Sequence, residues 1–320
     1  MSNEWLDTIV VTRHDATARI VVLDLVGPDD AELPEFAAGA HVDVLVDDSA
    51  GLVRQYSLCG PPDDRARYRL AVLAETASRG GSLGMHRLRE GDRLRISRPR
   101  NRFGISYEAR RHLLVAGGIG VTPLLAMAHT LEAGGAEYEL HYCARSRADA
   151  VFVEELERNP RVRLHFDDGP ADQRFSTAAD LGRPDPETAL YVCGPGGFMD
   201  FVISSALTAG WPSQAIHKER FAPVEDTAAH AAGATFTVRL AKTGREYEVK
   251  DGETVLDVLL AGGVDAPYSC RQGICGDCIV RVLAGEPDHR DDVLTDRERA
   301  DGKFTTCSSR ALSPILELDL

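Results

Sequence analysis

The 320-residue sequence contains no long hydrophobic run, and aromatic residues make up only 6% of it. A membrane-spanning helix needs about 20 consecutive, mainly apolar residues, and no stretch here approaches that length. The first residues, Met-Ser-Asn-Glu-Trp-Leu-Asp, lack the basic and then apolar order of a signal peptide. From these absences we expect a soluble, cytoplasmic protein with no membrane partner.

Positive charge is also scarce. The chain has 36 Lys and Arg against 50 Asp and Glu, which gives a formal net charge of −14. Nucleic-acid binding draws much of its affinity from cations that neutralise phosphates. We therefore expect no nucleic-acid partner, although local basic sites for small anionic ligands are compatible with this composition.

Only seven cysteines occur, which fits a reducing compartment better than a disulfide framework. Cys270, Cys275 and Cys278 form a C-x4-C-x2-C run, and Cys307 follows. This spacing is typical of plant-type ferredoxins, in which four thiolates hold a 2Fe–2S cluster. Zinc is the alternative metal, but zinc sites usually contain paired Cys-x2-Cys or Cys/His groups, and only one such pair occurs here.

The length predicts two or three domains, at roughly 100–200 residues per domain. In the first region, short alternating runs between turn residues predict an antiparallel barrel or sandwich. The expected strands are Arg19–Leu25, His41–Val46, Leu52–Leu58, Tyr68–Leu73 and Arg93–Ser97. A helix is expected over Leu83–Arg89, with Ser82 as its N-cap and an anion site at its start.

From His112 onward, strands alternate with helices, which predicts a parallel sheet covered on both faces and a nucleotide-binding architecture. The expected elements are strand His112–Ala116, a helix to about Ala133, strand Glu139–Ala144, a helix from about Asp149 to Arg158, strands Val162–Phe166 and Ala189–Cys193, a helix to about Ala209, and strand Ala215–Glu219.

Ala222–Ala234 reads as a linker because it has a proline, several alanines and no periodicity. Beyond it we expect strands and one helix with an acidic start. They are strands Thr235–Leu240, Glu246–Val249, Ile279–Leu283 and Ile315–Leu320, and helix Thr254–Ala261.

Three further motifs precede the cysteine run. The first is Arg54-Gln55-Tyr56-Ser57-Leu58, together with the loop Arg79-Gly80-Gly81-Ser82. The second is Gly117-Gly118-Ile119-Gly120-Val121-Thr122-Pro123, a glycine-rich turn between strand and helix that differs from the Gly-x-Gly-x-x-Gly fingerprint. The third joins Cys193-Gly194-Pro195 with His217-Lys218-Glu219-Arg220-Phe221.

In this order, the motifs resemble the phthalate dioxygenase reductase family, which includes vanillate demethylase reductases, over essentially the whole chain. The resemblance implies a multidomain chain: an antiparallel β-barrel for flavin (1–106), an α/β NAD(P) domain with a parallel sheet (107–223), a linker (224–234) and an α+β, β-grasp 2Fe–2S ferredoxin domain (235–320). The implied function is an oxidoreductase that takes electrons from NAD(P)H, holds them on flavin and passes them singly through the cluster to an oxygenase.

The resemblance also assigns roles around the flavin. Arg54 lies at the flavin phosphate, Tyr56 packs on the isoalloxazine, and Ser57 hydrogen-bonds near N5, with Gln55 inside the same motif. The loop Arg79, Gly80, Gly81 and Ser82 holds the terminal phosphate of FMN, which is favoured over FAD. Backbone groups around Val72, Leu73 and Ala74 are expected to touch the flavin. The alternative for the first motif alone is a strand with an edge arginine and a core tyrosine.

For the nucleotide, the family pattern gives Gly117, Gly118 and Gly120 as room for the pyrophosphate, with Thr122 and Pro123 near the flavin edge. Cys193, Gly194 and Pro195 would lie against the nicotinamide, and Glu219 and Phe221 would border the flavin. Ser57, Cys193 and Glu219 are the expected catalytic residues. The alternatives are a plain buried thiol for Cys193 and a solvated charge for Glu219.

Arg145-Ser146-Arg147 follows the second strand of the nucleotide domain, where the adenosine ribose is expected. Arginine there suits a 2′-phosphate, so the pair favours NADPH or dual use, with a solvated loop as the alternative.

The expected partner is a terminal oxygenase of the Rieske type, served by a monomeric reductase. A haem monooxygenase is the alternative acceptor, and a non-enzymatic redox sensor with the same fold is a weaker one. We also expect an acidic surface near the cluster to steer a basic acceptor, made of Asp277, Asp288, Asp291, Asp292, Asp296 and Glu298.

Overall fold

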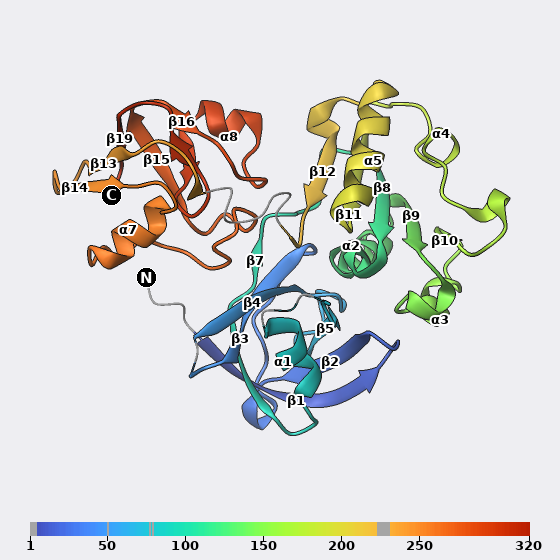
Figure 1. The fold of residues 1–320 in the computed structure, drawn as a ribbon. Coiled ribbons are helices and arrows are strands. Elements are labelled where there is room, and N and C mark those ends of the chain that lie inside the picture. Colours follow the sequence, from blue (N-terminus) through green and yellow to red (C-terminus); the bar gives the residue numbers. More distant parts are fainter. Residues whose placement is uncertain (1–4, 50, 77, 79, 223–230) are drawn as a thin grey trace. The chain divides into compact units, whose positions relative to one another are not determined.

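The computed structural model describes residues 5–49, 51–76, 78, 80–222 and 231–320 (Figure 1). The chain divides into two compact units, one running from Asn3 to Glu219 and the other containing Arg220–Leu320. No helix in the described ranges is both long and apolar enough to cross a bilayer.

The first unit begins with an antiparallel sheet that curls into a nearly closed barrel, blue in Figure 1. Its strand order is β4-β3-β6-β1-β2-β5, with β7 paired to β3. The strands are β1 (Trp5–Asp15), β2 (Ile20–Val26), β3 (Ala40–Asp47), β4 (Leu52–Ser57), β5 (Tyr68–Leu73), β6 (Arg93–Ser97) and β7 (Arg100–Asn101). Apolar side chains such as Leu23, Val42 and Ile96 are fully buried, so the barrel interior is the core of this part.

All five expected strands of the barrel are present, with ends that differ by a residue or so. Strand β1 was not expected. Only Thr8 and Val10 are buried along its eleven residues, so its sequence shows little of the alternation that marks a half-buried strand. It belongs to the sheet because it pairs with β2 on one side and β6 on the other.

Helix α1 (Gly81–Arg87) confirms the helical character of this region, but the expected N-cap is wrong. Gly80 occupies the position before the helix, with φ of 95°. Ser82 lies inside the first turn, where its hydroxyl accepts a hydrogen bond from Glu75 N at 3.1 Å. Glycine is required at residue 80 because a side chain rarely adopts a left-handed backbone.

The second part of this unit is a five-stranded parallel sheet in the order β10-β9-β8-β11-β12, green to yellow in Figure 1. Its elements are β8 (Arg111–Gly117), α2 (Val121–Ala133), β9 (Glu137–Ala144), β10 (Val162–Phe166), β11 (Thr188–Cys193), α5 (Gly196–Thr208) and β12 (Ile216–Glu219). Side chains of β8 alternate between two hydrophobic cores, one with α2 and one with α5. The predicted helical cover on both faces is confirmed.

One expected helix is much shorter than its pattern indicated. In place of a helix from about Asp149 to Arg158, the chain forms a 3₁₀ turn (Arg147–Asp149) and the one-turn helix α3 (Val153–Leu156). Phe152 between them has φ of 61°, which interrupts a right-handed helix. A further short helix, α4 (Thr177–Asp180), lies between β10 and β11 and was not expected.

The second unit is built on a five-stranded sheet in the order β14-β13-β19-β15-β17, orange to red in Figure 1. Its elements are β13 (Phe236–Leu240), β14 (Glu246–Val249), α7 (Val255–Ala261), β15 (Ile279–Ala284), β16 (Pro287–Asp288), α8 (Asp296–Ala300), β17 (Lys303–Thr305), β18 (Arg310–Ala311) and β19 (Ile315–Leu318). Thr254 caps α7 by accepting from Asp257 N. The sequence had not indicated β16, β17, β18 or α8.

Most of the expected linker, residues 223–230, lies outside the described residues. The last four residues of that segment are attached to the second unit by Arg310, whose side chain is buried. Its guanidinium donates to the carbonyls of Ala231 at 2.6 Å and Ala234 at 3.0 Å. It also donates to Glu253 O at 2.6 Å, which ties the segment to the start of α7.

Candidate functional site

Strand β4 divides its motif residues between the two faces of the barrel sheet. Because strand side chains alternate, Arg54 and Tyr56 lie on one face and Gln55 on the other. Gln55 Nε2 donates to Asp43 Oδ1 at 3.1 Å and lies 3.4 Å from His41 Nε2. The side chain of Gln55 therefore belongs to a polar cluster on the opposite face from Arg54 and Tyr56.

Arg54 lies directly against the glycine loop that starts α1. A Cβ placed on Gly81 would come within 2.5 Å of Arg54 Cγ and 2.9 Å of Arg54 Nε. Residue 81 must therefore be glycine, because any side chain there would clash with the aliphatic part of Arg54. Arg79, the first residue of the motif, lies outside the described residues. A guanidinium beside backbone N–H groups at a helix start fits the phosphate of a flavin mononucleotide.

The backbone of Val72 and Ala74 is already engaged inside the barrel. His86 Nε2 lies 2.9 Å from the carbonyl oxygen of Val72. Ala74 N donates to Arg19 O, and Ala74 O accepts from Arg19 Nη2, both at 2.8 Å. These polar groups are thus used in holding the barrel and α1, and Leu73 between them is only partly buried. We therefore expect this stretch to contact a flavin mainly by packing against it, and not through these hydrogen-bonded groups.

Two loops at the carboxyl edge of the parallel sheet touch through their backbones. A Cβ on Gly120 would lie 2.4 Å from both C and O of Cys193 and 2.6 Å from Gly194 N. A Cβ on Gly194 would lie 2.9 Å from the Cα of Gly117. Only glycines permit this approach, and the approach brings the β8–α2 and β11–α5 turns together at one edge. Pro195 follows Gly194 and directly precedes α5.

Thr122 and Pro123 form the first turn of α2 and shape the same edge. Thr122 is buried, and its hydroxyl donates to Ile119 O at 3.0 Å. Gly118 has φ of 52°, and a Cβ there would meet nothing within 4 Å, so the surface of this glycine is open. Thr122 therefore stabilises the turn, while the open glycine surface suits the close approach of a pyrophosphate.

The three expected catalytic residues come together at this edge. Cys193 pairs with Glu219 across β11 and β12, and Ser57 Oγ donates to Glu219 Oε2 at 3.4 Å. Burial raises the pKa of Glu219 to about 8, partly opposed by the Ser57 hydrogen bond. Burial also raises the pKa of the Cys193 thiol. The Glu219 carboxyl and the Cys193 thiol are therefore mainly protonated at neutral pH, although the Glu219 side chain is partly exposed.

The remaining residues expected to bind cofactors differ in their pairing and exposure. Arg147 Nη2 pairs with Glu157 Oε2 at 2.7 Å, and Ser146 Oγ donates to Asp149 Oδ2 at 2.7 Å. Arg145 is exposed. Phe221 belongs to the second unit, in which it is 40% exposed.

In the second unit, the four predicted cysteines converge. Cys278 Sγ lies 3.2 Å from Cys307 Sγ, and the thiol of Cys270 hydrogen-bonds those of Cys275 and Cys307. All four are free thiols, and all except Cys270 are buried. Contacts with the neighbouring thiols lower the pKa of Cys270 and Cys278 and raise the pKa of Cys275 and Cys307. Four sulfurs gathered in one place fit the donor set of a 2Fe–2S cluster.

Backbone N–H groups also point at these sulfurs. Gln272 N lies 3.3 Å from Cys270 Sγ, and Asp277 N lies 3.5 Å from Cys275 Sγ. Gly273 has φ of 73°, and a Cβ there would meet Ser308 Oγ at 2.6 Å. Residue 273 must therefore be glycine, both for its backbone conformation and because Ser308 lies so close.

A buried polar network beside this loop was missed from the sequence. Asp291 is buried and accepts from Leu294 N at 2.8 Å and from Ser309 Oγ at 3.3 Å. Thr305 joins the same group, with its hydroxyl 2.9 Å from Ser308 Oγ. Hydroxyl residues on both sides of Cys307 were the available signal. They are polar residues at buried positions, which need partners.

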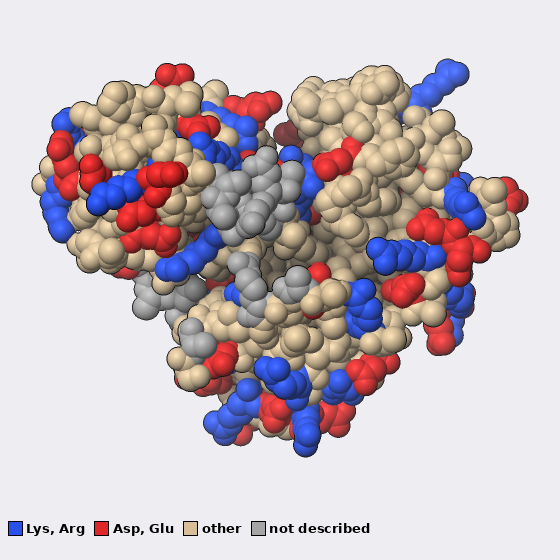
Figure 2. Space-filling model, viewed as in Figure 1, with Lys and Arg blue, Asp and Glu red and all other residues tan. Residues whose placement is uncertain are grey.

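This network corrects the expected acidic surface. Asp291 is inside the unit, Asp288 pairs with Arg290 at 2.6 Å, and Glu298 pairs with Lys303 at 2.6 Å. In Figure 2 acidic and basic side chains are interspersed on the visible face of this unit. Half of the six acidic residues therefore do not offer an unpaired negative charge to a partner.

Comparison with known proteins gives two family matches. Residues 238–312 match the 2Fe-2S iron-sulfur cluster binding domain, and residues 95–216 match the N-terminal domain of the dimethylamine monooxygenase subunit DmmA-like family. The chain is 46% identical to the vanillate O-demethylase oxidoreductase of Pseudomonas sp. (strain HR199 / DSM 7063), over 98% of this chain and 100% of that one.

Two of the solved structures that share the fold over 99% of the chain come from different electron-transfer systems. One is phthalate dioxygenase reductase, described as a modular structure for electron transfer from pyridine nucleotides to [2Fe-2S], with a TM-score of 0.71, 36% identity and 98% of its chain covered. The other is an intact type IV self-sufficient cytochrome P450 monooxygenase, with a TM-score of 0.88 and 38% identity. Our chain spans 41% of the length of that fusion protein.

The chain belongs to the phthalate dioxygenase reductase family. The predicted family and fold class are thereby confirmed. The predicted oxidoreductase function as an oxygenase reductase component and the cofactor set of FMN, NAD(P)H and a 2Fe–2S cluster are confirmed as well.

Proposed function

We propose that this chain carries electrons from NAD(P)H through FMN and a 2Fe–2S cluster to a Rieske-type terminal oxygenase. The observation that carries the proposal is the convergence of four free thiols in a chain that also builds a glycine-lined nucleotide edge. A zinc site would use four sulfurs equally well, but it would leave that edge without a purpose. Flavin, when bound, supplies the step between two-electron and one-electron chemistry.

In this proposal, the first unit positions its ligands and performs no nucleophilic chemistry. Arg54, Gly80 and Gly81 hold the flavin phosphate, and Tyr56 offers its partly buried ring to the flavin. Hydride transfer depends on alignment, so the touching Gly120 and Cys193 turns act by fixing where the nicotinamide lies.

Ser57, Cys193 and Glu219 form the polar contacts next to the reacting rings. With a pKa of about 8, Glu219 is mainly protonated at neutral pH. A neutral carboxyl avoids placing a negative charge beside a site that receives a hydride. The Glu219 carboxyl also accepts a hydrogen bond from the Ser57 hydroxyl.

We favour Arg145 over Arg147 as the residue that selects NADPH. Both arginines are exposed, but the Arg147 guanidinium is paired with Glu157 at 2.7 Å. A guanidinium suits a 2′-phosphate. We expect Arg145→Glu to lower kcat/KM for NADPH about tenfold relative to NADH, with Arg147→Glu as the matched control. Equal effects of the two variants, or a strong NADH preference of the wild type, would contradict this assignment.

A haem monooxygenase is the second candidate acceptor. The likeness to a cytochrome P450 fusion protein supports it, whereas the 46% identical relative is a vanillate O-demethylase oxidoreductase. The experiment mixes the holoprotein with a purified Rieske oxygenase and, separately, with a purified P450, under NADPH. Substrate oxidation by the Rieske protein at a rate well above that with the P450 supports the proposal, and the reverse order overturns it.

We also propose the domain boundaries 1–106, 107–223 and 235–320, with residues 224–234 as linker and a monomeric chain. The hydrogen bonds of Arg310 to Ala231 and Ala234 support counting these residues with the ferredoxin unit. Limited proteolysis of the holoprotein tests this, because cleavage should fall before Ala231 and release an intact ferredoxin unit. Size-exclusion chromatography with light scattering tests the monomer.

A further inference from the structure

A buried carboxylate lies directly behind the cysteine loop. The side chain of Asp291 is fully buried. A Cβ on Gly273 would lie 3.4 Å from the Cα of Asp291, and Asp292 N donates to Gly273 O at 3.1 Å. Gly273 stands between the expected ligands Cys270 and Cys275 in the sequence. Asp291 therefore packs against the loop that would hold a cluster.

The same carboxylate also contacts the segment that contains the fourth cysteine. Asp291 Oδ1 accepts from Ser309 Oγ at 3.3 Å and from Thr305 Oγ1 at 3.4 Å. These two hydroxyl residues lie two positions after and two positions before Cys307, and their oxygens are 2.8 Å apart. Both are buried and need partners within the protein. Asp291 therefore connects the Cys307 segment with the loop that contains the other cysteines.

Neutral donors satisfy the oxygens of Asp291 without cancelling its charge. Leu294 N donates to Oδ2 at 2.8 Å, and the two hydroxyls donate to Oδ1. The guanidinium of Arg299 is 3.6 Å from Oδ2 and donates to the backbone carbonyl of Asp291 at 2.8 Å. His289 Nδ1 lies 3.6 Å from Oδ1, and burial lowers the pKa of His289, so this ring is mainly neutral at neutral pH.

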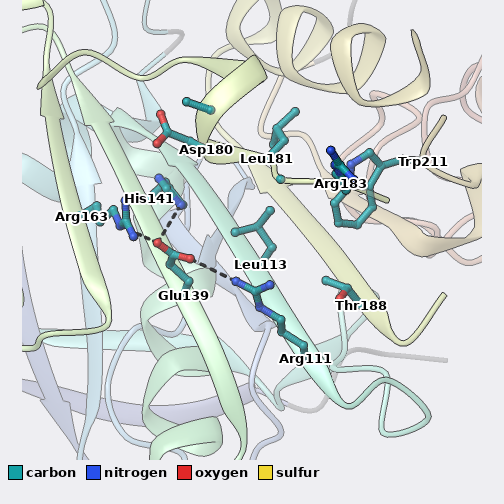
Figure 3. A pocket seen from close by; sticks show the side chains of 12 residues that line it. Arg111, Leu113, Glu139, His141, Arg163, Asp180, Leu181, Arg183, Thr188 and Trp211 are labelled. Carbon is teal, nitrogen blue, oxygen red and sulfur yellow. Dashed lines mark hydrogen bonds and ion pairs between the residues drawn. The ribbon is translucent and has the colours of Figure 1, made fainter. Parts of the chain in front are cut away.

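Glu139 in the first unit is neutralised much more completely. In Figure 3 its carboxylate lies among basic side chains, and Arg111 and Arg163 pair with it at 3.3 Å and 2.5 Å. The Glu139 side chain is also 21% exposed, whereas that of Asp291 is 0% exposed. A buried charge is screened less by water and salt than a partly exposed one. The charge of Asp291 therefore acts more strongly on its surroundings.

A buried negative charge beside a redox centre changes the reduction potential of that centre. In the proposed relay the cluster site takes one electron from the flavin, and its net charge becomes one unit more negative. A neighbouring carboxylate opposes this step, because like charges repel more strongly inside a protein than in water. Reduction potentials of iron–sulfur sites depend on net charge, on hydrogen bonds to the sulfurs and on solvent exposure. A more negative potential makes the site a stronger reductant for its acceptor.

We propose that Asp291 lowers the reduction potential of the 2Fe–2S cluster, as a positioning residue that acts through its buried charge and through the Cys307 segment. Arg299, whose side chain is 33% exposed, is the outer partner that partly offsets this charge. The inference deepens the proposed function and rests on it, because it requires a cluster at the four cysteines. It applies equally to a Rieske and to a haem acceptor.

Anaerobic spectroelectrochemistry of the holoprotein measures the potential, with the electron paramagnetic resonance signal of the reduced cluster recorded in parallel. Asp291→Asn keeps the shape of the side chain and removes its charge. At a fixed applied potential its ratio of reduced to oxidised cluster should rise about tenfold, a positive shift of about 59 mV for one electron. Asp296→Asn is the matched control, because it removes the same charge from an exposed residue at the start of α8 and should match wild type.

Arg299→Gln gives a shift whose sign a loosened fold does not imitate. It removes the cation opposite Asp291, so the ratio of reduced to oxidised cluster should fall, by about threefold because the arginine is partly exposed. If Asp291→Asn loses its cluster, a fall in Arg299→Gln alone still supports the inference and an unchanged ratio overturns it. Shifts of the same sign in both variants, or equal shifts in Asp291→Asn and Asp296→Asn, also overturn it. Wild type without any cluster signal would overturn the proposed function as well.

Discussion

Adding one methyl group at Gly120 tests whether the contact between the two carboxyl-edge turns builds the nucleotide site. In Gly120→Ala the new Cβ would lie 2.4 Å from C and O of Cys193 and 2.6 Å from Gly194 N. These are backbone atoms of a strand end and cannot rotate away as a flexible side chain can. Overpacking of this kind costs about 3 kcal/mol, at the upper end of the usual range. For a unit of this size we expect a melting temperature lower by about 6–12 °C.

Gly197→Ala is the matched control. Gly197 lies in the first turn of α5, and a Cβ there meets nothing within 4 Å. Alanine in a helix is favoured over glycine by about 1 kcal/mol, so this variant should be as stable as wild type or slightly more so. The assay is thermal unfolding of the flavin-loaded protein by circular dichroism, with the KM for NADPH measured in parallel. If Gly120→Ala matches Gly197→Ala in stability and in KM, the two turns do not form the site as described.

Three other predictions follow from named contacts. Ser57→Ala removes the hydroxyl that donates to Glu219, and stopped-flow flavin reduction should slow about tenfold, as expected for the loss of about 1.4 kcal/mol of alignment, while the KM for NADPH changes little. Burial raises the pKa of Glu219 from 4.5 to about 8, so its protonated form stabilises the fold fully below pH 4.5 and that contribution is lost as pH rises through about 8. The full pKa difference corresponds to about 5 kcal/mol of unfolding free energy, and partial exposure reduces it to about 2–3 kcal/mol. Urea unfolding at pH 5 and pH 9 should show this loss of stability in wild type and not in Glu219→Gln. Arg310→Met should destabilise the ferredoxin unit by about 3 kcal/mol because it leaves the buried carbonyls of Ala231 and Glu253 without a donor. Thermal unfolding measured by cluster absorbance tests this, and an unchanged melting temperature would exclude that role for Arg310.

The sequence predicted well those features that depend on local patterns. Strands β5, β6, β10 and β14 begin and end at the expected residues, because apolar alternation and turn residues mark both ends. The cysteine spacing likewise predicted four thiols in one place. In each of these cases, a short stretch of sequence contains the whole signal.

Features set by tertiary packing were harder to predict. Strand β1 has mainly polar exposed positions, and it is a strand because β2 and β6 pair with it. Asp291 was assigned to the surface as one of several acidic residues near the cluster, and only the fold shows Ser309 and Leu294 N as its partners. Phe152 in a left-handed conformation is likewise a consequence of its surroundings.

Gln55 is different, because a signal was present in the sequence. Strand alternation alone places it on the opposite face from Arg54 and Tyr56. Its assignment to the flavin came from its membership of the motif, and the structure places its side chain with Asp43. A motif identifies a stretch, whereas the period of the element determines which of its side chains point into the site.

The central claim is that electrons move from nucleotide to flavin and only then to the cysteine site. Anaerobic stopped-flow mixing of holoprotein with NADPH, monitored at flavin and cluster wavelengths, tests it most directly. Wild type should show flavin reduction first and cluster reduction second. Cys307→Ser should lose the cluster and the second phase, keep the first phase at its wild-type rate, and no longer support turnover of an oxygenase. Cluster reduction before flavin reduction, or undiminished oxygenase turnover by Cys307→Ser, would contradict the account.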